Sequence, residues 1–464
     1  MISTVNEFKS VFFIGVAGVG MSAIAQYLAG TGKEVSGSDR YFVDGEHNET
    51  KDKLESAGIK CFIQNGAGIN ESTDLIIVSA AIEDTIAEVQ KAKSLSIPII
   101  KRSELLALIA QSKKTIAIGG TSGKSTTTAM LFDIMESAGM DPSIISGAGL
   151  VSLIKNNKIG NAKVGEGEWL IIEADESDGS IVEYTPEIGV LLNVDKDHQE
   201  MEELMDVFTT FKHNTANLFI VNQANVYAKA LSKDINYDFS ADASIEAGYI
   251  AAGFKQEKLN ISFSIRTPEE DETDFFLQTV GRHNMENALA AVAVANQIGI
   301  SLADCSTGLK KYEGIYRRHQ LLGIKNGVYV IDDYAHNPVK CAASIAACQN
   351  ISPKVVAWFQ PHGYGPTRFL KDDFIKEISN VLRPQDEIWM SEIYYAGGTA
   401  EKNISANDLI IEIKKSGKNA WFVEDRNKFL DEVRPHLTNN TVLLLMGARD
   451  PGLEIFSKSI WDKL

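Results

Sequence analysis

The chain has 464 residues, a formal net charge of −17, 44% hydrophobic residues and 23% charged residues. This length exceeds what one hydrophobic core supports, so two or three domains are expected, and three is our starting prediction. The composition is that of a folded globular protein, and the negative charge argues against nonspecific binding to nucleic-acid phosphates.

The start of the chain and its cysteines indicate a cytoplasmic protein. The first apolar run, residues 11–14, is broken at Gly15, and it has neither the length nor the cleavage pattern of a signal peptide. No apolar run reaches the roughly 20 residues that span a bilayer. The four cysteines have no paired-ligand spacing, so reduced structural thiols are favoured over disulfides or a zinc site.

The first hundred residues alternate β-rich and helical patterns, which predicts a parallel sheet with crossover helices. Strands are expected at 11–14, 34–38, 75–79 and 97–100, with helices at about 21–31 and at 103–111. Gly15, Gly18 and Gly20 form a glycine-rich loop between the first strand and the first helix, and Asp39 closes the second strand. This arrangement suits a nucleotide, with the acid on a ribose hydroxyl, although many such turns serve only close helix packing.

A second α/β unit begins near Lys113 and contains the strongest motif of the chain. A strand leads into the loop Gly119-Gly120-Thr121-Ser122-Gly123-Lys124-Ser125, and a helix is expected from about Thr126. Three residues separate the two outer glycines, where the strict phosphate-loop pattern has four. The loop N–H groups and Lys124 suit ATP phosphates, and the Ser125 hydroxyl suits Mg²⁺. The alternative is an incidental glycine-rich turn.

Acidic residues follow the next two predicted strands. The strand at 169–172 ends at Glu173, which we expect to bind the magnesium of a nucleotide, the alternative being a solvated acidic turn. The strand at 188–192 leads to Asn193, Asp195, Asp197 and His198. A histidine beside these acids is a candidate metal ligand or phosphate contact, although a surface histidine is commoner.

Three strands of the third region, at 328–331, 355–359 and 442–446, each end in polar residues. The first precedes Asp333 and His336, the second precedes Gln360-Pro361-His362, and the third precedes Gly447-Ala448-Arg449-Asp450. Ligands of parallel sheets bind beyond the carboxyl ends of the strands, so these residues are expected at one site. Residues 312–318 are a predicted hinge, with Arg317 and Arg318 available for phosphate oxygens or simply exposed.

The order of motifs resembles the Mur ligase family over nearly the whole chain. The motifs are FIGVAGVGMSAIA, SGSD, GGTSGKSTTT, EADESD, NVDKDH, GRHNMENALAA, YEGIYRRH, DDYAHNP, FQPH and GARD. The resemblance implies an α/β protein of three domains. They are an N-terminal Rossmann-like domain for a UDP sugar (1–111), a central P-loop ATPase domain with a parallel sheet (112–315), and a C-terminal Rossmann-like α/β domain that brings the amino acid (316–464).

The activity implied by the resemblance is ATP-dependent amide-bond formation in peptidoglycan precursor synthesis. A carboxylate of UDP-N-acetylmuramic acid attacks the γ-phosphate of ATP, and an amine, expected to be L-alanine, captures the acyl phosphate. ADP and phosphate leave. Closure of the third domain is expected to keep water from the acyl phosphate. The expected cofactors are ATP and Mg²⁺, and the expected state is a monomer or homodimer, without nucleic acid or membrane insertion.

The resemblance also assigns residues. The catalytic residues are expected to be Lys124, His198, Arg318 and His336, and the metal ligands Ser125, Glu173 and His198. The expected ATP contacts are Gly120, Thr121, Ser122, Gly123, Lys124, Ser125, Thr126, Asn284, Asn287, Arg318 and Asp333. The expected UDP-sugar contacts are Gly15, Gly18, Gly20, Met21, Ser22, Asp39 and Ser79.

Several positions depart from the family pattern and leave alternatives open. Ser122 replaces a histidine and Ser125 a threonine of the usual GTHGKTTT, Asn337 replaces a second histidine, and Gly363 and Pro366 stand where arginine is common. One alternative is a ligase for a recycled tripeptide or another amino acid on the same sugar nucleotide. Others are a regulatory nucleotide-binding paralogue that has lost ligation and, from the first glycine loop, a dinucleotide-dependent dehydrogenase.

Overall fold

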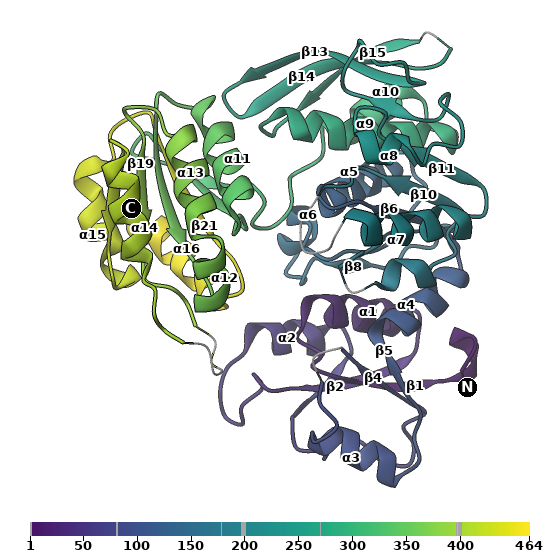
Figure 1. Ribbon diagram of the computed structural model, residues 1–464. Helices are drawn as coiled ribbons and strands as arrows, with labels where there is room; N and C mark the ends of the chain where they lie inside the picture. The colour runs from purple at the N-terminus through teal and green to yellow at the C-terminus, as the bar shows by residue number, and fades with distance from the viewer. Residues whose placement is uncertain are drawn as a thin grey trace. The chain divides into compact units, whose positions relative to one another are not determined.

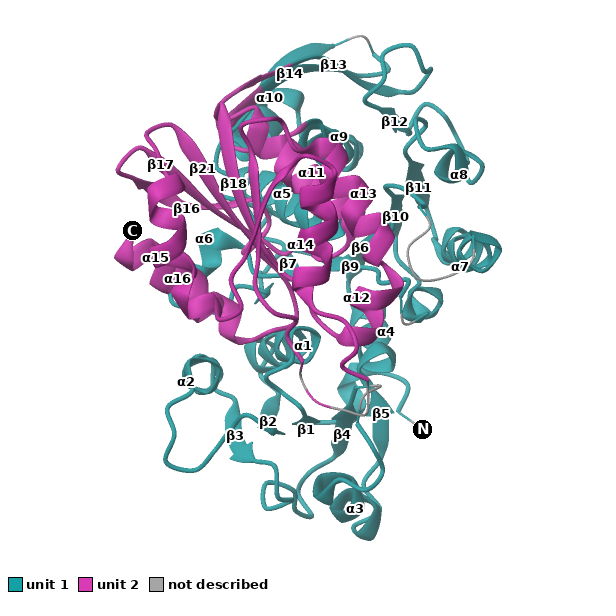
Figure 2. Cartoon of the chain, turned by 60° about the vertical axis from the view of Figure 1, so that its left-hand side comes forward, with its two compact units in different colours: residues 1–254, 262–278, 282–315 teal, residues 255–261, 279–281, 316–464 magenta. Residues whose placement is uncertain are grey.

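The computed structural model describes residues 2–79, 82–177, 179–195, 201–269, 271–395, 397 and 401–464. The chain divides into two compact units (Figure 2). The first contains residues 1–254, 262–278 and 282–315, and the second contains residues 255–261, 279–281 and 316–464. The last boundary follows Ile315, inside the stretch predicted as a hinge.

The first unit begins with a five-stranded parallel sheet in the order β3-β2-β1-β4-β5. Its strands are β1 (Ser10–Ile14), β2 (Glu34–Asp39), β3 (Lys60–Ile63), β4 (Leu75–Val78) and β5 (Ile99–Lys101), and its helices are α1 (Val19–Gly30), α2 (Glu49–Ser56), α3 (Ala87–Ser94) and α4 (Arg102–Gln111). The predicted parallel sheet is confirmed. Helix α1 begins earlier than expected, so Gly20 lies in its first turn and not in the loop.

A six-stranded sheet follows in the order β11-β10-β6-β9-β7-β8, parallel except for the pair β7 and β8. Its strands are β6 (Lys114–Gly119), β7 (Ser143–Ile145), β8 (Ala162–Lys163), β9 (Trp169–Glu173), β10 (Ile188–Leu191) and β11 (Leu218–Val221), with helices α5 (Lys124–Ser137), α6 (Val151–Ile154), α7 (Met201–Asn214) and α8 (Val226–Lys229). Helix α5 begins two residues earlier than predicted. Lys124 and Ser125 therefore lie in its first turn.

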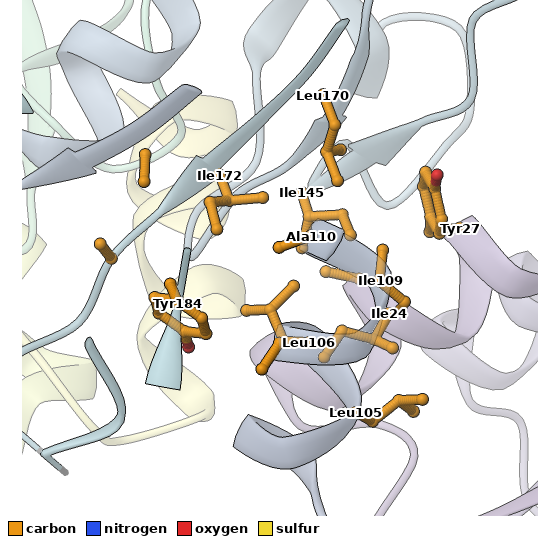
Figure 3. Packing of buried hydrophobic residues seen from close by; sticks show 14 of the residues in the cluster. Ile24, Tyr27, Leu105, Leu106, Ile109, Ala110, Ile145, Leu170, Ile172 and Tyr184 are labelled. Atoms are coloured by element: carbon orange, nitrogen blue, oxygen red, sulfur yellow. The ribbon is translucent and has the colours of Figure 1, made fainter. Parts of the chain in front are cut away.

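Helices α1 and α4 join these two sheets into one hydrophobic core. Figure 3 shows Ile24 of α1 and Leu106 of α4 beside Leu170 and Ile172 of β9, and all four side chains are buried. Asn161, which is 1% exposed, adds buried hydrogen bonds from the second sheet to α1. The two glycine loops of the sequence are thus carried by a single packed body.

A four-stranded sheet between the second and third regions was not predicted from the sequence. Its order is β12-β13-β14-β15, with β12 (Phe239–Ser240), β13 (Tyr249–Glu257), β14 (Asn260–Arg266) and β15 (Glu272–Leu277), followed by α9 (Arg282–Gln297) and α10 (Leu302–Leu309). Along β14, buried and partly exposed residues alternate, which is the pattern of a sheet with one covered face. The predicted α/β alternation is therefore interrupted here.

The second unit is built on a six-stranded sheet in the order β16-β17-β21-β18-β19-β20, parallel except for β16 against β17. The strands are β16 (Gln320–Lys325), β17 (Val328–Asp333), β18 (Lys354–Gln360), β19 (Glu387–Met390), β20 (Asn419–Phe422) and β21 (Thr441–Gly447). The helices are α11 (Pro338–Gln349), α12 (Tyr364–Phe369), α13 (Lys371–Val381), α14 (Ala406–Lys415), α15 (Phe429–Val433) and α16 (Gly452–Lys463), as Figure 1 shows.

Successive residues of the central strands of this sheet belong to two separate cores. Val355 and Ala357 pack with α11, α13 and α14, whereas Val356 and Trp358 pack with α15 and α16. Burial on both faces explains why these strands are continuous apolar runs in the sequence. Strand β17 continues to Asp333, two residues beyond its predicted end.

Within the described residues, no helix combines the length and the hydropathy needed to cross a bilayer.

Candidate active site

The loop between β6 and α5 has the backbone of a phosphate-binding turn. Gly120 and Gly123 have φ angles of +135° and +87°, which glycine adopts without the strain of a side chain. A Cβ atom on Gly123 would also run into Oδ1 of Asn287. Gly123 is the N-cap of α5, with no side chain capping the helix. The first turn of this 14-residue helix therefore directs its N–H groups and the positive end of its dipole at the loop.

Asn193 holds the loop from the neighbouring strand, because β10 pairs with β6 and ends just before it. Its Oδ1 accepts from the Ser122 backbone N–H and from the Thr121 hydroxyl, each at 2.8 Å. Its Nδ2 donates to the Ser122 carbonyl at 3.1 Å, and its own carbonyl accepts the Thr121 N–H at 3.2 Å. In the sequence Asn193 only follows a predicted strand and has no predicted role. The structure makes it a clamp on the loop.

Lys124 is directed back into the loop. Its ammonium donates to the Gly120 carbonyl and to Oε2 of Glu176, both at 2.7 Å. Glu176 follows β9 and is only 6% exposed. Burial raises the pKa of the Glu176 carboxyl, and the Lys124 charge opposes that rise. Glu176 belongs to the EADESD motif and had no predicted role, because its pairing depends on the position of β9 beside β6.

Ser125 and Glu173 lie together at the same sheet edge. The Ser125 hydroxyl donates to Oε2 of Glu173 at 3.0 Å, and Oε1 accepts from the Ser146 hydroxyl and the Gly147 N–H at 2.6 and 2.7 Å. A hydroxyl beside a carboxylate is the hard oxygen donor set that suits Mg²⁺. His198, the third expected ligand, lies outside the described residues. Among the residues that are described, no three His, Cys, Asp or Glu side chains form a metal-binding group.

The end of the loop contacts α9, which carries both predicted adenine-side residues. Asn287 accepts from the Thr127 hydroxyl at 3.4 Å and donates to Oδ1 of Asn284 at 3.3 Å. Both asparagines are 7% exposed. Thr126, another expected ATP contact, lies in the first turn of α5, next to Ser125. The structure therefore gathers the loop and the two asparagines at one place.

The first glycine loop is closed by the end of β2. The N–H of Gly15 donates to the Ser38 carbonyl at 2.8 Å. The carboxylate of Asp39 is 4% exposed and accepts the N–H groups of Ala17 and Tyr41 at 2.9 and 3.1 Å. The residue pattern had suggested a ribose ligand at this position. In the structure both oxygens of Asp39 hold the chain around the loop, and its contact with a ligand stays a prediction.

The other expected UDP-sugar residues divide into buried and accessible positions. Met21 and Ser22 are buried in α1, and the Ser22 hydroxyl accepts from Nδ2 of Asn161 at 2.9 Å. Gly18 is the N-cap of α1. Ser79 is partly exposed and follows β4, the strand next to β1. Gly18 and Ser79 thus lie at the carboxyl edge of this sheet, the edge at which ligands of parallel sheets bind.

In the second unit, two histidines lie together beyond β17 and β18. The rings of His336 and His362 are 5.7 Å apart, and Nδ1 of His336 is 3.0 Å from the Tyr334 carbonyl. Burial lowers the pKa of His336 to about 4 and also lowers the pKa of His362. Both imidazoles are therefore expected to be neutral near pH 7. Arg318 is exposed, and its guanidinium stacks 5.0 Å from the centre of the Tyr334 ring.

The residues beside this pair are mostly engaged within the unit. Asp333 is buried, accepts from the Ser344 hydroxyl at 2.6 Å and lies 3.2 Å from Nδ1 of His319. Arg317 is buried as well, and its Nε lies 3.2 Å from both oxygens of Asp332. The expectation that Arg317 is available for phosphate is wrong, because its charge is used inside the unit. Of the two arginines, Arg318 is exposed.

A third arginine at this edge was missed from the sequence. Nη1 of Arg426 donates to Oε1 of Gln360 at 2.7 Å and forms an ion pair with Asp450. It therefore links the last residue of β18 to the segment that follows β21. Arg426 lies in an ordinary polar stretch, and no pattern around it indicates that the fold brings it there.

Asn337, one of the departures from the family pattern, has a structural role. Its side chain caps α11 by accepting the N–H of Lys340 at 2.9 Å, and Pro338 occupies the first turn. Asparagine is among the best N-cap residues and proline suits the first helical position.

Comparisons with known proteins match three family models along the chain in order. They are described as Mur ligase family, catalytic domain (residues 10–114), Mur ligase middle domain (118–295), and Mur ligase, glutamate ligase domain (317–449).

Curated relatives match the chain over nearly its full length. A UDP-N-acetylmuramate--L-alanine ligase of Carboxydothermus hydrogenoformans is 34% identical over 96% of this chain and 95% of its own. One from Geobacter sulfurreducens is 32% identical with the same coverage. Among solved structures, the UDP-N-acetylmuramate-alanine ligase MurC of Thermotoga maritima has a TM-score of 0.81 at 25% identity over 98% of both chains. A murein peptide ligase of Psychrobacter arcticus shares the fold, with a TM-score of 0.68 at 19% identity.

The fold expected from the motifs, three α/β domains with parallel sheets, is thereby confirmed. With relatives above 30% identity across almost all of its length, the chain belongs to the Mur ligase family.

Proposed function

We propose that this Mur ligase uses ATP to join L-alanine to the carboxylate of UDP-N-acetylmuramic acid, releasing ADP and phosphate. The observation that carries the proposal is the first turn of α5, where Lys124 and Ser125 face the acids that follow β9. Full-length relatives named for this reaction support it.

Each loop residue has a role in this proposal. Lys124 offsets the charge on the transferred phosphoryl group, and Ser125 and Glu173, together with His198, hold Mg²⁺. When bound, the ion neutralises phosphate charge. Asn284 and Asn287 lie beside the end of the loop and are proposed to contact the adenine end of ATP. Arg318, Asp333 and His336 are the proposed contribution of the second unit.

The proposal includes a division of the chain at residues 1–111, 112–315 and 316–464, for the UDP sugar, ATP and the amino acid respectively. The sheet topology is consistent with it, because each segment contains its own mainly parallel sheet, and the second segment has the four-stranded sheet in addition. A cytoplasmic location and a monomer or homodimer complete the proposal.

The amine is the least constrained part. Helix α12 begins after Gly363, and Tyr364 of this helix lines an open cavity of about 370 Å³ together with Glu392, Lys402 and Asp408. The ammonium of Lys402 lies 5.9 Å from the centre of the Tyr364 ring. The departures at Gly363 and Pro366 lie beside this surface depression, and a tripeptide is therefore kept as the second candidate amine.

The test is a substrate panel. The protein is incubated with ATP, MgCl₂, UDP-N-acetylmuramic acid and either L-alanine, other amino acids or a murein tripeptide, and phosphate release is followed. We expect release to require both the sugar nucleotide and L-alanine, and mass spectrometry to detect the amide product. Reactions lacking either substrate and a Lys124→Ala variant are the controls. Release with the tripeptide alone would replace L-alanine in the proposal, and no amine-dependent release would refute ligation.

A further inference from the structure

We propose that Glu176 is a positioning residue that holds Lys124 in the nucleotide-free loop and competes with the nucleotide phosphates for its ammonium group. Binding of ATP then requires this ion pair to be given up. The inference rests on the proposed function only in taking ATP as the nucleotide.

The pair is short and shielded. Lys124 Nζ lies 2.7 Å from Oε2 of Glu176, and the two side chains are 15% and 8% exposed. The same ammonium donates to the Gly120 carbonyl at 2.7 Å, so two of its three N–H groups are directed at the protein. Asp175 is a poor substitute partner, since it lies 3.9 Å away and its side chain is 44% exposed.

Two acids at the end of β9 and just after it contact two successive residues of α5. Glu173 contacts Ser125 and is held by the Ser146 hydroxyl and the Gly147 N–H. Glu176 contacts Lys124. The first acid is thus matched to the hydroxyl proposed for the metal, and the other to the cation proposed for the phosphates.

Competition follows from charge. A carboxylate and a phosphate are both anions and both seek the same ammonium, and exclusion of water makes their mutual repulsion stronger than at the surface. The N–H groups at the start of α5 attract phosphate to this place. Replacing the Glu176 carboxylate by an amide of the same shape therefore leaves the Lys124 ammonium without its close anionic partner. The nucleotide phosphates can then take that place. A merely structural Glu176 would contribute to stability and leave nucleotide affinity unchanged.

The experiment measures the Kd of ADP and of a nonhydrolysable ATP analogue by calorimetry at fixed pH and salt, in the full-length protein without sugar nucleotide or amine. We expect Glu176→Gln to lower Kd about five- to tenfold, the scale of a close, partly buried charge pair. Asp175→Asn is the matched control and is expected to change Kd by less than about twofold. Glu176→Asp, which restores the charge, is expected to return Kd toward the wild-type value.

A double-mutant cycle separates competition from a structural effect. In a Lys124→Met background, Glu176→Gln should no longer tighten binding, because the ammonium for which the two anions compete is gone. Unchanged or weaker binding by Glu176→Gln, or the same gain in the Lys124→Met background, would overturn the proposal. Wild-type protein that binds no nucleotide would overturn both proposals, whereas nucleotide binding without amine-dependent phosphate release would refute ligation alone.

Discussion

The two glycine loops of the first unit have the same place in the fold, but they differ in backbone conformation and in side chains, because the N-cap Gly18 is extended and the N-cap Gly123 is left-handed. Each joins a parallel strand to a helix, and each is held by a polar residue at the end of the neighbouring strand, Asp39 in the first loop and Asn193 in the second. Only the second adds a cation and a hydroxyl, Lys124 and Ser125, opposite two acids.

The difference shows that a glycine-rich turn indicates a strand-to-helix connection but does not identify the ligand bound there. Glycines allow the backbone of each loop to turn from a strand into a helix, and they do not by themselves select a ligand. The ligand is selected by the side chains of the first helical turn and by what the next strands bring opposite them. If the two loops are separate functional sites on one packed body, substitutions in one loop should leave the function of the other unchanged.

The largest effect is expected from Lys124→Ala. Loss of a preorganised charge at the γ-phosphate should lower kcat about 10²- to 10³-fold in the phosphate-release assay, and the variant should also lose stability because buried Glu176 loses its cation partner. Lys33→Ala is the comparison, because Lys33 follows α1 and donates to the carbonyls of Val5 and Phe8 at 2.7 and 2.6 Å. That variant should lose stability and retain its kcat. Equal losses of kcat in both would erase the distinction between the loops.

Gly123→Ala should cost both folding and nucleotide binding. Its φ of +87° strains an L side chain by roughly 1–2 kcal/mol, and the new methyl group would meet Oδ1 of Asn287. Gly32→Ala provides the same φ, +86°, with nothing within 4 Å of the added atom. We expect urea unfolding to show the larger loss for Gly123→Ala, and calorimetry to show ADP binding weakened only in that variant. Similar results for both would leave the loop geometry without a special role.

Asp39→Ala is expected to act on the first loop alone. It leaves the Ala17 and Tyr41 N–H groups without their acceptor, at a cost of about 1–3 kcal/mol in stability. The KM for the sugar nucleotide should rise while the Kd of ADP stays constant. Asn193→Ala should show the reverse pattern. If each variant moved both constants, the two loops would be one coupled site.

The smallest effect is expected from Ser125→Ala. The variant removes a neutral hydroxyl that contacts Glu173, so the MgCl₂ concentration for half-maximal rate should rise about tenfold. A Ser125→Thr variant retains the hydroxyl and should behave as the wild type. Unchanged Mg²⁺ dependence in Ser125→Ala would remove this residue from the proposed metal site.

The second unit also has a candidate site at one edge of its sheet, but this site has no glycine loop. The three predicted strands β17, β18 and β21 are neighbours in the sheet, and the structure brings His336 and His362 together at their ends. That juxtaposition was expected from the sequence, because parallel strands end at one edge. The expectation that Arg317 is available for phosphate was wrong. Asp332 of β17 pairs with its guanidinium, and no local pattern in the sequence indicates this contact.

The sequence by itself determined the strands and helices that carry both loops, because apolar runs and glycine positions are local. It also indicated the family, through motifs whose order spans the chain. The sheet at Phe239–Leu277 was missed because its strands follow one another without helices. Only the tertiary structure decided which acid faces which loop residue. Glu173 and Glu176 are three positions apart, and their assignment to Ser125 and Lys124 depends on β9 lying beside β6. Pairings of that kind arise from long-range strand order, which no local pattern encodes.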